Sequence, residues 1–504
     1  MKVLFFNPSR AGQGNIPLNI PLLIGAAKAR HHEVWLFDLS DYQVFDDKLF
    51  ESAFFKEAAF GEERILQARK LFHGKDYGIH VRGYDLKSSD YRNDFESVLN
   101  RFAPDMIAVS CLSVDFPFAA DFLRSFRNRY RIPVVFGGIH AILMPDEVIH
   151  SDVCDILCTG EGENTFPELL DCLDRGDPLE KVRGVWFKKN GCVHKTPPMP
   201  LTDFADLPEP DFDLFDPIHF YRPFDGKRYV MLNYELSRGC PFNCTYCVNG
   251  VLKEKYRGLG RYHRIKDPRR SIRELETLTG RYGFNFIRFW DEDFTSIPEE
   301  FLKEYGDLYL EKIGLPFLIY ARVDTVTEEK VRILKRMGCR TFAMGIESGN
   351  EFIRRKIMNR NISNETIVER FRLVKSHGIR VSSYNIIGLP FETRESIEDT
   401  IELNRRVNPD SFSVTLLEPY KGTPIRKICE DEGLDPGLEP SWNKVQFIPR
   451  GMTKTELMGL YRTFPLYIKF PRSRFHEIRR AETDERSFHA LRAELKEHEQ
   501  VVPK

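Results

Sequence analysis

The stretch Ser237-Arg-Gly-Cys-Pro-Phe-Asn-Cys-Thr-Tyr-Cys-Val-Asn-Gly250 organises the interpretation of the whole chain. It places Cys240, Cys244 and Cys247 in a C-x3-C-x2-C spacing, on a loop that follows the apolar run from Tyr229 to Leu236. Thiolates this close together can converge on one soft metal centre. Four thiolates would close a zinc or iron–sulfur site, whereas three leave one metal position open. The spacing therefore favours an iron–sulfur cluster with a free iron that can take a substrate.

Zinc binding, disulfide bonding and chance clustering are the competing interpretations of these cysteines. A zinc site needs a fourth ligand, and the nearest histidine, His263, has no second histidine at ligand spacing in the sequence. Ten cysteines in 504 residues is a low density for a disulfide-linked secreted protein. The first residues, Met1 to Phe6, also lack the pattern of a signal peptide. We therefore expect a cluster site.

Length and charge limit the classes of protein that this sequence can encode. A chain of 504 residues is long enough for two or three domains. Its 74 basic and 75 acidic residues give a net charge of −1, which argues against nucleic acid as a partner. No apolar run reaches the roughly 18 residues of a membrane span. We expect a soluble, cytoplasmic protein in a reducing compartment, with no transmembrane segment.

The N-terminal part alternates apolar strand patterns with helical patterns. Strands are predicted over 2–7, 32–39, 105–111, 133–136 and 155–159, with helices over 21–30, 116–129 and 165–172. This alternation is typical of an α/β, doubly wound, Rossmann-like domain, which we place at residues 1–195. Residues 41–98 are predicted to be a helical insertion, and residues 182–198 a hairpin with a turn at Asn190-Gly191.

Ligands of a doubly wound sheet bind beyond the carboxyl ends of its strands. Turn-forming residues gather at these predicted strand ends, and paired glycines there let a bulky ligand approach the backbone. The candidate binding residues are Asn7, Ser9, Ser110, Leu112, Gly137, Gly138, Glu161 and Gly162.

A second β/α rhythm begins near residue 223, after a segment at 196–222 that reads as a linker held by aromatic residues. Six apolar strands are predicted, at 229–236, 284–290, 316–321, 341–346, 381–387 and 411–417. Helical patterns separate them, which predicts a partial (β/α)6 barrel of the TIM type at 223–430. Residues 431–504 lose the rhythm and are predicted to form a mostly helical C-terminal cap.

The cysteine triplet, with an aromatic residue just before its last cysteine, resembles the signature of radical S-adenosylmethionine (SAM) enzymes. The resemblance implies a [4Fe-4S] cluster whose open iron is chelated by SAM, with Tyr246 packed on the adenine. By the same resemblance, polar residues at the other strand ends bind SAM. The family often has Gly-Gly-Glu at the second strand end, where this chain has Trp-Asp-Glu-Asp. The candidate SAM residues are Asp291 or Glu292 for the ammonium (Asp291 preferred), Arg322 for the carboxylate, Glu347 and Ser348 for the ribose, and Gly388 for the adenine.

The N-terminal domain resembles cobalamin-binding domains, because Ser110-x-Leu112 is followed by Gly137-Gly138. The commonest form of that family has Asp-x-His-x-x-Gly after its first strand, where this chain has Asn-Pro-Ser-Arg-Ala-Gly at residues 7–12. The chain therefore resembles the domain that binds cobalamin without a protein imidazole. His140 is expected to have a structural role at its strand end and not to bind cobalt.

Together the two resemblances imply a cobalamin-dependent radical SAM enzyme of the class B methylase type. In that family, one electron from the cluster cleaves SAM to a 5′-deoxyadenosyl radical, which removes a hydrogen atom from an unactivated carbon. That carbon then takes a methyl group from methylcobalamin. No catalytic side chain beyond the cofactors is expected. The implied partners are a small-molecule substrate and an external electron donor of the flavodoxin or ferredoxin type.

Three functions remain open on the sequence. The first is C-methylation of a small molecule, natural product, lipid or tetrapyrrole, or of a phosphinate centre. The second is oxidation or ring formation with the same cofactors. The third is a non-catalytic cobalamin carrier or sensor, which would have no need of the SAM residues. The product distinguishes the first two, since one gains a methyl group and the other loses hydrogen or gains oxygen.

Overall fold

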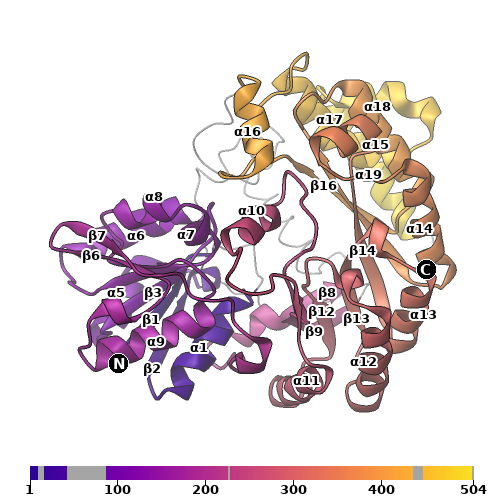
Figure 1. The fold of residues 1–504 in the computed structure, drawn as a ribbon. Helices are drawn as coiled ribbons and strands as arrows, with labels where there is room; N and C mark the ends of the chain where they lie inside the picture. Colours follow the sequence, from indigo (N-terminus) through magenta and orange to yellow (C-terminus); the bar gives the residue numbers. More distant parts are fainter. Residues whose placement is uncertain (10–15, 43–86, 225–226, 435–446, 502–504) are drawn as a thin grey trace. The chain divides into compact units, whose positions relative to one another are not determined.

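The computed structural model describes residues 1–9, 16–42, 87–224, 227–434 and 447–501 (Figure 1). Most of the insertion predicted at 41–98 lies outside these residues. Its described end contains the start of helix α5 (Tyr91–Phe102). None of the helices in the described ranges combines the length and apolar character that a bilayer span requires.

The N-terminal sheet has seven strands in the order β2-β1-β3-β4-β5-β6-β7. The first five are parallel, in the 2-1-3-4-5 order of a doubly wound fold, which confirms the predicted class. The predicted hairpin forms β6 and β7, and it extends the sheet in antiparallel pairing. The strands are β1 (Lys2–Asn7), β2 (Glu33–Asp38), β3 (Met106–Ser110), β4 (Val134–Gly137), β5 (Ile156–Cys158), β6 (Val185–Lys189) and β7 (Cys192–Lys195).

Helices cover both faces of this sheet because its central strands are apolar on both sides. Successive side chains of β1 point to opposite faces. Phe6 stacks on Phe122 of α6 (Phe116–Arg127), with 5.0 Å between the ring centroids. Phe5 meets Phe166 of α9 (Gly162–Asp174) at 5.5 Å on the other face, where α1 (Asn19–Ala29) also packs (Figure 1). The strand ends are thereby held at one edge.

The second large sheet has the order β16-β15-β14-β13-β12-β9-β8. The pairings from β12 to β16 are parallel, and β8 is antiparallel to β9. All six predicted barrel strands are present, so the partial barrel is confirmed. The strands are β8 (Tyr221–Phe224), β9 (Lys227–Tyr234), β12 (Phe286–Phe289), β13 (Phe317–Arg322), β14 (Cys339–Glu347), β15 (Arg380–Ile387) and β16 (Ser411–Leu416).

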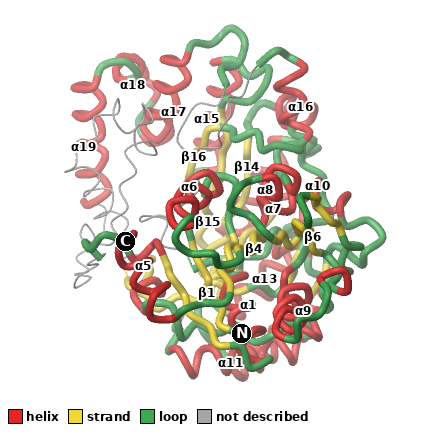
Figure 2. The backbone as a smooth tube through the Cα atoms, turned by 90° about the vertical axis from the view of Figure 1, so that its left-hand side faces the viewer, coloured by secondary structure: helices red, strands yellow, loops and turns green. Residues whose placement is uncertain are grey.

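Helices follow these strands and continue into the C-terminal region. The helices between the strands are α11 (Pro268–Tyr282), α12 (Glu299–Lys312), α13 (Glu328–Met337), α14 (Asn364–Ser376) and α15 (Arg394–Val407). The mostly helical cap is confirmed by α17 (Lys454–Lys469), α18 (Phe475–Ala481) and α19 (Glu485–Val501), drawn in red in Figure 2. α17 packs on α15, and an ion pair joins Arg394 to Glu482.

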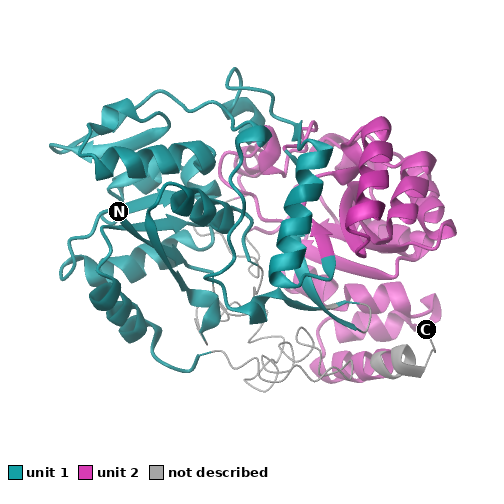
Figure 3. Cartoon of the chain, turned by 90° about the horizontal axis from the view of Figure 1, so that it is seen from below, with its two compact units in different colours: residues 1–45, 69–238, 252–286 teal, residues 46–68, 239–251, 287–504 magenta. Residues whose placement is uncertain are grey.

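The chain divides into two compact units (Figure 3). The first contains residues 1–45, 69–238 and 252–286, and the second contains 46–68, 239–251 and 287–504. The cysteine loop and the strand ends from β12 to β16 therefore belong to one unit. The N-terminal sheet and the predicted linker belong to the other. The domain boundaries inferred from the sequence stay a prediction.

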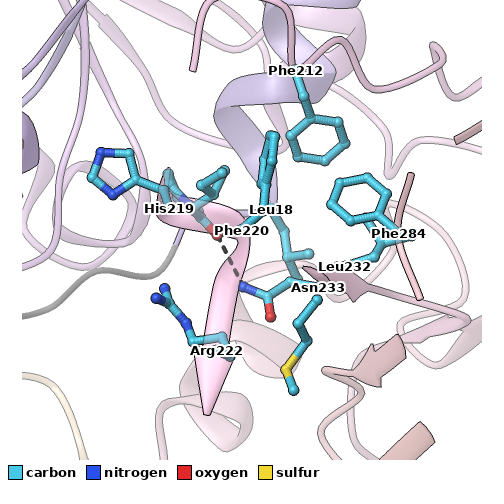
Figure 4. Close-up of a pocket in the computed structure, with 11 residues that line it drawn as sticks. Leu18, Phe212, His219, Phe220, Arg222, Leu232, Asn233 and Phe284 are labelled. Carbon is cyan, nitrogen blue, oxygen red and sulfur yellow. Dashed lines mark hydrogen bonds between the residues drawn. The ribbon is translucent and has the colours of Figure 1, made fainter. Parts of the chain in front are cut away.

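Aromatic side chains of the predicted linker pack within the first unit. Phe212 lies 5.9 Å from Phe220 and 5.8 Å from Phe284, measured between ring centroids. These rings line a small cavity of about 10 Å³, shown in Figure 4, to which His219, Arg222 and Asn233 add polar groups. Asn233 Nδ2 donates to the carbonyl of Ile16 at 3.2 Å, which ties β9 to the chain just before α1. The linker is therefore packed rather than extended.

We predict that Gly349→Ala destabilises the protein, because the chain after β14 touches α15 backbone there. A Cβ at residue 349 would meet the carbonyl of Asp399 and lie 2.5 Å from Thr400 Cα. Forcing these backbones apart should cost about 1–3 kcal/mol, measured by denaturant unfolding. Gly280→Ala is the matched control: no atom lies within 4 Å of its Cβ, so it should be neutral or stabilise α11 by up to about 1 kcal/mol. Equal effects of the two variants would contradict the packing argument.

Candidate functional site

The three cysteines lie on a buried loop of the second unit. Cys240 and Cys244 are each 8% exposed, and α10 (Val248–Lys255) begins directly after Cys247. All ten cysteines of the chain are free thiols. Gly239, with φ of +89°, turns the chain into the loop, and its N–H donates to Glu292 Oε2 at 3.1 Å. The loop is thereby attached to the end of β12.

Thr245, between the second and third cysteines, anchors the loop on two sides. Its N–H donates to the carbonyl of Met358 at 3.2 Å and its hydroxyl to the carbonyl of Ile357 at 2.5 Å. Its own carbonyl accepts from the N–H of Ile425, in α16 (Pro424–Asp431), at 3.1 Å. Anchoring by backbone groups makes the position of the sulfurs depend on the fold and not on flexible side chains.

The surroundings of the thiols fit a bound iron–sulfur cluster. Burial raises the pKa of Cys240 to about 12 and also raises the pKa of Cys247. Thiols in such a site ionise when cations, such as the irons of a cluster, coordinate them. Arg322 Nη1 donates to Cys244 Sγ at 2.9 Å and Asn249 Nδ2 to Cys247 Sγ at 3.6 Å. N–H groups that donate to sulfur are the contacts that tune a cluster's reduction potential.

Arg322, predicted to bind the SAM carboxylate, is held beside this loop. It donates from Nε and Nη2 to Asp324 at 3.0 and 2.7 Å, and its guanidinium lies 3.7 Å from the ring centre of Phe242. Its backbone N–H donates to Asp293, which also accepts from Thr325. The charge is therefore fixed at the mouth of the loop, and its role toward SAM stays a prediction.

The three acids after β12 occupy distinct places. Asp291 is 2% exposed. Glu292 accepts from the N–H of Gly239. Asp293 supports Arg322, and burial raises its pKa. The assignment of Asp291 to the SAM ammonium stays a prediction, whereas Glu292 and Asp293 have contacts that position the loop and the arginine.

Arg360 is a residue of this site that the sequence analysis missed. Its Nη1 donates to Tyr246 Oη at 3.1 Å and to Glu347 Oε1 at 2.9 Å, and its Nη2 donates to the carbonyl of Gly345 at 3.0 Å. Glu347 has φ of +65°, and its carboxylate folds back over Gly345, where a Cβ would collide with it. Burial raises the pKa of Glu347 above its ordinary value, and the charge of Arg360 offsets only part of that rise. Arg360 lies in no motif and at no strand end, so only the fold reveals it.

Ser348 and Gly388, the remaining SAM candidates, are held by internal hydrogen bonds. Ser348 is fully buried, and its carbonyl accepts from Arg354 Nη1 at 2.5 Å. Gly388 has φ of +79°, and its N–H donates to Glu392 Oε2 at 2.6 Å. Burial raises the pKa of Glu392 to about 8. Glu392 shapes this turn and was not predicted from the sequence.

The cobalamin candidates Ser110, Gly137 and Gly138 form one surface at the carboxyl edge of the first sheet. Gly138 has φ of +87°, and a Cβ there would lie 2.7 Å from Ser110 Oγ. Asn19 Nδ2 donates to the same hydroxyl at 2.5 Å. Leu112 is 44% exposed beside them. A close-packed backbone next to exposed apolar surface fits the flat, bulky ligand that the resemblance implies.

Asn7, Ser9 and His140 make contacts within the first unit. Asn7 is 4% exposed and donates from Nδ2 to Asp38 Oδ1 at 3.0 Å, and its own Oδ1 accepts from the N–H of Ser9 at 3.3 Å. His140 is 3% exposed, with Nδ1 3.0 Å from Ser113 Oγ and its ring 4.5 Å from that of Phe116. The absence of a cobalt-ligating histidine stays a prediction.

Glu161, a further cobalamin candidate, belongs to a buried charge network. It pairs with Arg264 at 2.5 Å and with Arg238 at 3.1 Å, and it accepts from the N–H of Thr202 at 2.8 Å. Arg238 also pairs with Glu163 at 2.8 Å. The neighbouring Gly162 begins α9, and a Cβ there would lie 3.1 Å from the side chain of Leu23. The network joins the edge of the cobalamin-type sheet to the residue that directly precedes Gly239.

We predict that this network makes stability depend on acid. Burial alone would raise the pKa of Glu161, but hydrogen bonds and charge from Arg264 and Arg238 lower it to about 2 from an ordinary 4.5. The contribution of Glu161 should be complete above about pH 4.5 and lost as pH falls toward about 2. Glu161→Gln should cost about 3–5 kcal/mol at neutral pH, measured by denaturant unfolding, and flatten this acid dependence. Glu180→Gln, in an exposed pair with Lys189, should cost at most about 1 kcal/mol.

We also predict that Arg360→Gln weakens SAM binding without removing the cluster. The change leaves Glu347 without its ion pair and Tyr246 without its hydrogen bond to Arg360, while the cysteine loop keeps its Thr245 anchors. The dissociation constant for SAM should rise about tenfold or more by calorimetry under anaerobic conditions, with iron content unchanged. Arg355→Gln, a half-exposed neighbour paired with Glu351, is the control and should bind SAM normally. Loss of iron in the Arg360 variant would show instead that Arg360 holds the loop.

Two family models match the chain in this order. The B12 binding domain matches residues 73–170, and the Radical SAM superfamily matches residues 234–403. The second range contains the three cysteines and all the SAM candidates. The first contains the strands β3, β4 and β5.

Relatives with assigned names are similar over most of the chain. The uncharacterized methyltransferase PH0819 of Pyrococcus horikoshii is 30% identical over 335 residues, which are 66% of this chain and 70% of that protein. The anaerobic magnesium-protoporphyrin IX monomethyl ester cyclase of Rubrivivax gelatinosus is 26% identical over 69% of this chain and 64% of its own length.

A solved structure has the same fold. The radical S-adenosylmethionine methyltransferase TsrM from Kitasatospora setae superposes with a TM-score of 0.64 at 16% identity, covering 85% of this chain and 76% of that one. The two family models, the Pyrococcus relative and the fold all point to the same family. The chain belongs to the cobalamin-dependent radical SAM enzymes, the family of methyltransferases and related enzymes whose cofactors are a [4Fe-4S] cluster, SAM and cobalamin.

Proposed function

We propose that this enzyme methylates an unactivated carbon of a small molecule, with SAM as the source of the methyl group and cobalamin as its carrier. The observation that carries the proposal is the cysteine loop, in which a hydrogen bond from Arg322 to Cys244 sets a cation beside the thiols. The similarity to a methyltransferase at 30% identity supports the type of reaction.

The chain's own residues bind and orient the reactants in this proposal. When bound, the cluster and SAM supply a radical that removes hydrogen from the substrate, and methylcobalamin supplies the methyl group. Cys240, Cys244 and Cys247 hold the cluster. Asp291 binds the SAM ammonium, and Arg322, fixed by Asp324, binds its carboxylate through a charge-assisted hydrogen bond.

The remaining candidates complete the two cofactor sites. Glu347 and Ser348 bind the ribose, Tyr246 packs on the adenine, and backbone groups at Gly388 contact the base edge. Asn7, Ser9, Ser110, Leu112, Gly137, Gly138, Glu161 and Gly162 line or support the cobalamin site. No side chain is needed as a general acid or base, because the transferred groups are a hydrogen atom and a methyl group.

Ring formation or oxidation is the second candidate function. A specific observation favours keeping it: the cyclase of Rubrivivax gelatinosus is similar over 69% of this chain. Both reactions would use the same cysteine loop and the same SAM residues. They differ in whether the substrate gains a methyl group.

We further propose that the enzyme works in the cytoplasm and takes its electron from a flavodoxin or ferredoxin type of donor. Ten free thiols are compatible with a reducing compartment. A cluster that must be reduced before each SAM cleavage requires an external one-electron donor.

The test is an anaerobic incubation of the reconstituted enzyme with SAM labelled in its methyl group, a reductant and a pool of candidate metabolites. We expect a product that gains the labelled methyl group, together with 5′-deoxyadenosine. Cys244→Ala should form neither, and Cys172→Ala, a cysteine of α9 in the first unit, should form both. A product that loses hydrogen or gains oxygen without the label would replace methylation by the second candidate function.

A further inference from the structure

The barrel strands of the second unit have one face packed against helices and one face with partly exposed side chains. In β15, Val381, Ser383 and Ile387 are completely buried, whereas the alternate residues, Ser382 and Tyr384, are half-buried. In β13, Phe317 and Ile319 are buried whereas Leu318 and Tyr320 are half-buried, and in β12 Arg288 is half-buried between the buried Ile287 and Phe289. Side chains on one face of a strand recur every second residue. We call the partly exposed side the inner face, because helices cover the other.

Four residues form a cluster on the inner face: Arg288, Trp290, Tyr320 and Tyr384. The guanidinium of Arg288 lies 3.7 Å from the ring centre of Trp290, and its Nε donates to Tyr320 Oη at 2.7 Å. The Tyr320 ring lies 5.5 Å from that of Trp290 and 6.1 Å from that of Tyr384. Trp290 is 36% exposed.

Strand β14 separates Tyr320 from Tyr384 and offers only small side chains between them. Its Ala343 pairs in register with Tyr320, and its Gly345 pairs with Tyr384. Ala343 leaves room beside Tyr320, whereas the space over Gly345 is occupied by the Glu347 carboxylate and Arg360 Nη1. The sheet therefore brings aromatic rings and the Arg288 cation together next to the Glu347–Arg360 ion pair.

The cluster lies next to the cofactor residues along the same strands. Arg322, which donates to Cys244 Sγ, follows Tyr320 by two residues on the same face of β13. Two residues of a strand span roughly 6–7 Å. Asp291 directly follows Trp290. The four inner-face residues thus lie about two residues along the strand from the residues that contact the cysteine loop.

We propose that Arg288, Trp290, Tyr320 and Tyr384 form the substrate-recognition site, and that the substrate combines an aromatic or other planar ring with a carboxylate or phosphate group. This inference rests on the proposed function only in assuming that a substrate reacts beside the cysteine loop. Arg288 binds the acidic group, and Trp290 and the tyrosines contact the ring.

The chemistry of the four side chains supports this class of substrate. The hydrogen bond to the Tyr320 hydroxyl and the stacking on Trp290 orient the guanidinium. A planar guanidinium pairs with carboxylate and phosphate oxygens in a fixed geometry. Burial, followed by the neighbouring Tyr320, raises the pKa of Tyr384, so its hydroxyl stays protonated and can donate to the same acidic group. Aromatic faces at 5–6 Å spacing favour stacked rings.

The test measures binding of three probes that share one ring and differ in charge. 1-Naphthoate, 1-naphthyl phosphate and the neutral 1-naphthamide are titrated by calorimetry into the anaerobic enzyme containing cluster, cobalamin and SAM. At least one anion should bind at least about tenfold more tightly than the amide, because a charge-assisted hydrogen bond is lost in the amide. The tighter anion then identifies carboxylate or phosphate as the natural acidic group.

Variants test whether the four residues on the inner face cause the preference for the anionic probes. Arg288→Gln should reduce the affinity for both anions to that of the amide, and Arg288→Lys should keep part of the preference. Trp290→Ala should weaken all three probes. Arg340→Gln, an exposed arginine at the other end of the same sheet, is the control and should bind as the unchanged enzyme does. Iron and cobalamin content of each variant shows that it is folded, and if Arg288→Gln loses them, Arg288→Lys decides.

Three outcomes would overturn the inference. They are equal binding of the amide and the anions, unchanged anion binding in Arg288→Gln, and no binding of any probe. Because binding is read without turnover, its failure differs from a failure of the proposed function. Probes could bind as predicted while no label is transferred, or label could be transferred to a substrate that the Arg288 variant still binds.

Discussion

The ion pair between Glu347 and Arg360 is the interaction on which the surroundings of the cysteine loop depend. Arg360 bonds at once to the carboxylate after β14 and to Tyr246 in the cysteine loop, two segments more than a hundred residues apart in sequence. Burying a carboxylate or a guanidinium alone would be costly, so each holds the other in place. The backbone pays a local strain at Glu347, whose positive φ is uncommon for a residue with a side chain.

Carboxylates also hold backbone N–H groups where several loops leave their strands. Glu292 holds the N–H of Gly239, Asp293 holds that of Arg322, and Glu392 holds that of Gly388. In the first unit, Glu161 and Arg264 do the same for the edge of the cobalamin-type sheet. Buried acids in this protein therefore serve largely to orient backbone and cations.

In our proposal, the arginine among aromatic rings on the inner face supplies the substrate specificity of this common framework. Arg288 and Tyr320 lie on neighbouring strands, and Tyr384 comes within reach because Ala343 and Gly345 are small. The names of two relatives, a methyltransferase and a cyclase, describe different reactions.

The sequence by itself determined the fold class and pointed to the cofactors, because both depend on local patterns. That Cys240, Cys244 and Cys247 are the cluster ligands stays a prediction. Apolar runs alternating with helical periods predict parallel sheets, and the spacing of Cys240, Cys244 and Cys247 carries its own chemistry. The sequence also located the strand ends that hold the SAM candidates. Only the tertiary structure decided which side chains meet there. Arg360 reaches the site from a turn that carries no motif. The carboxylate of Glu161 forms ion pairs with Arg264 and Arg238. The cluster around Arg288 depends on strand register across β14. Such contacts are set by side-chain direction and packing between distant segments, which no local pattern encodes.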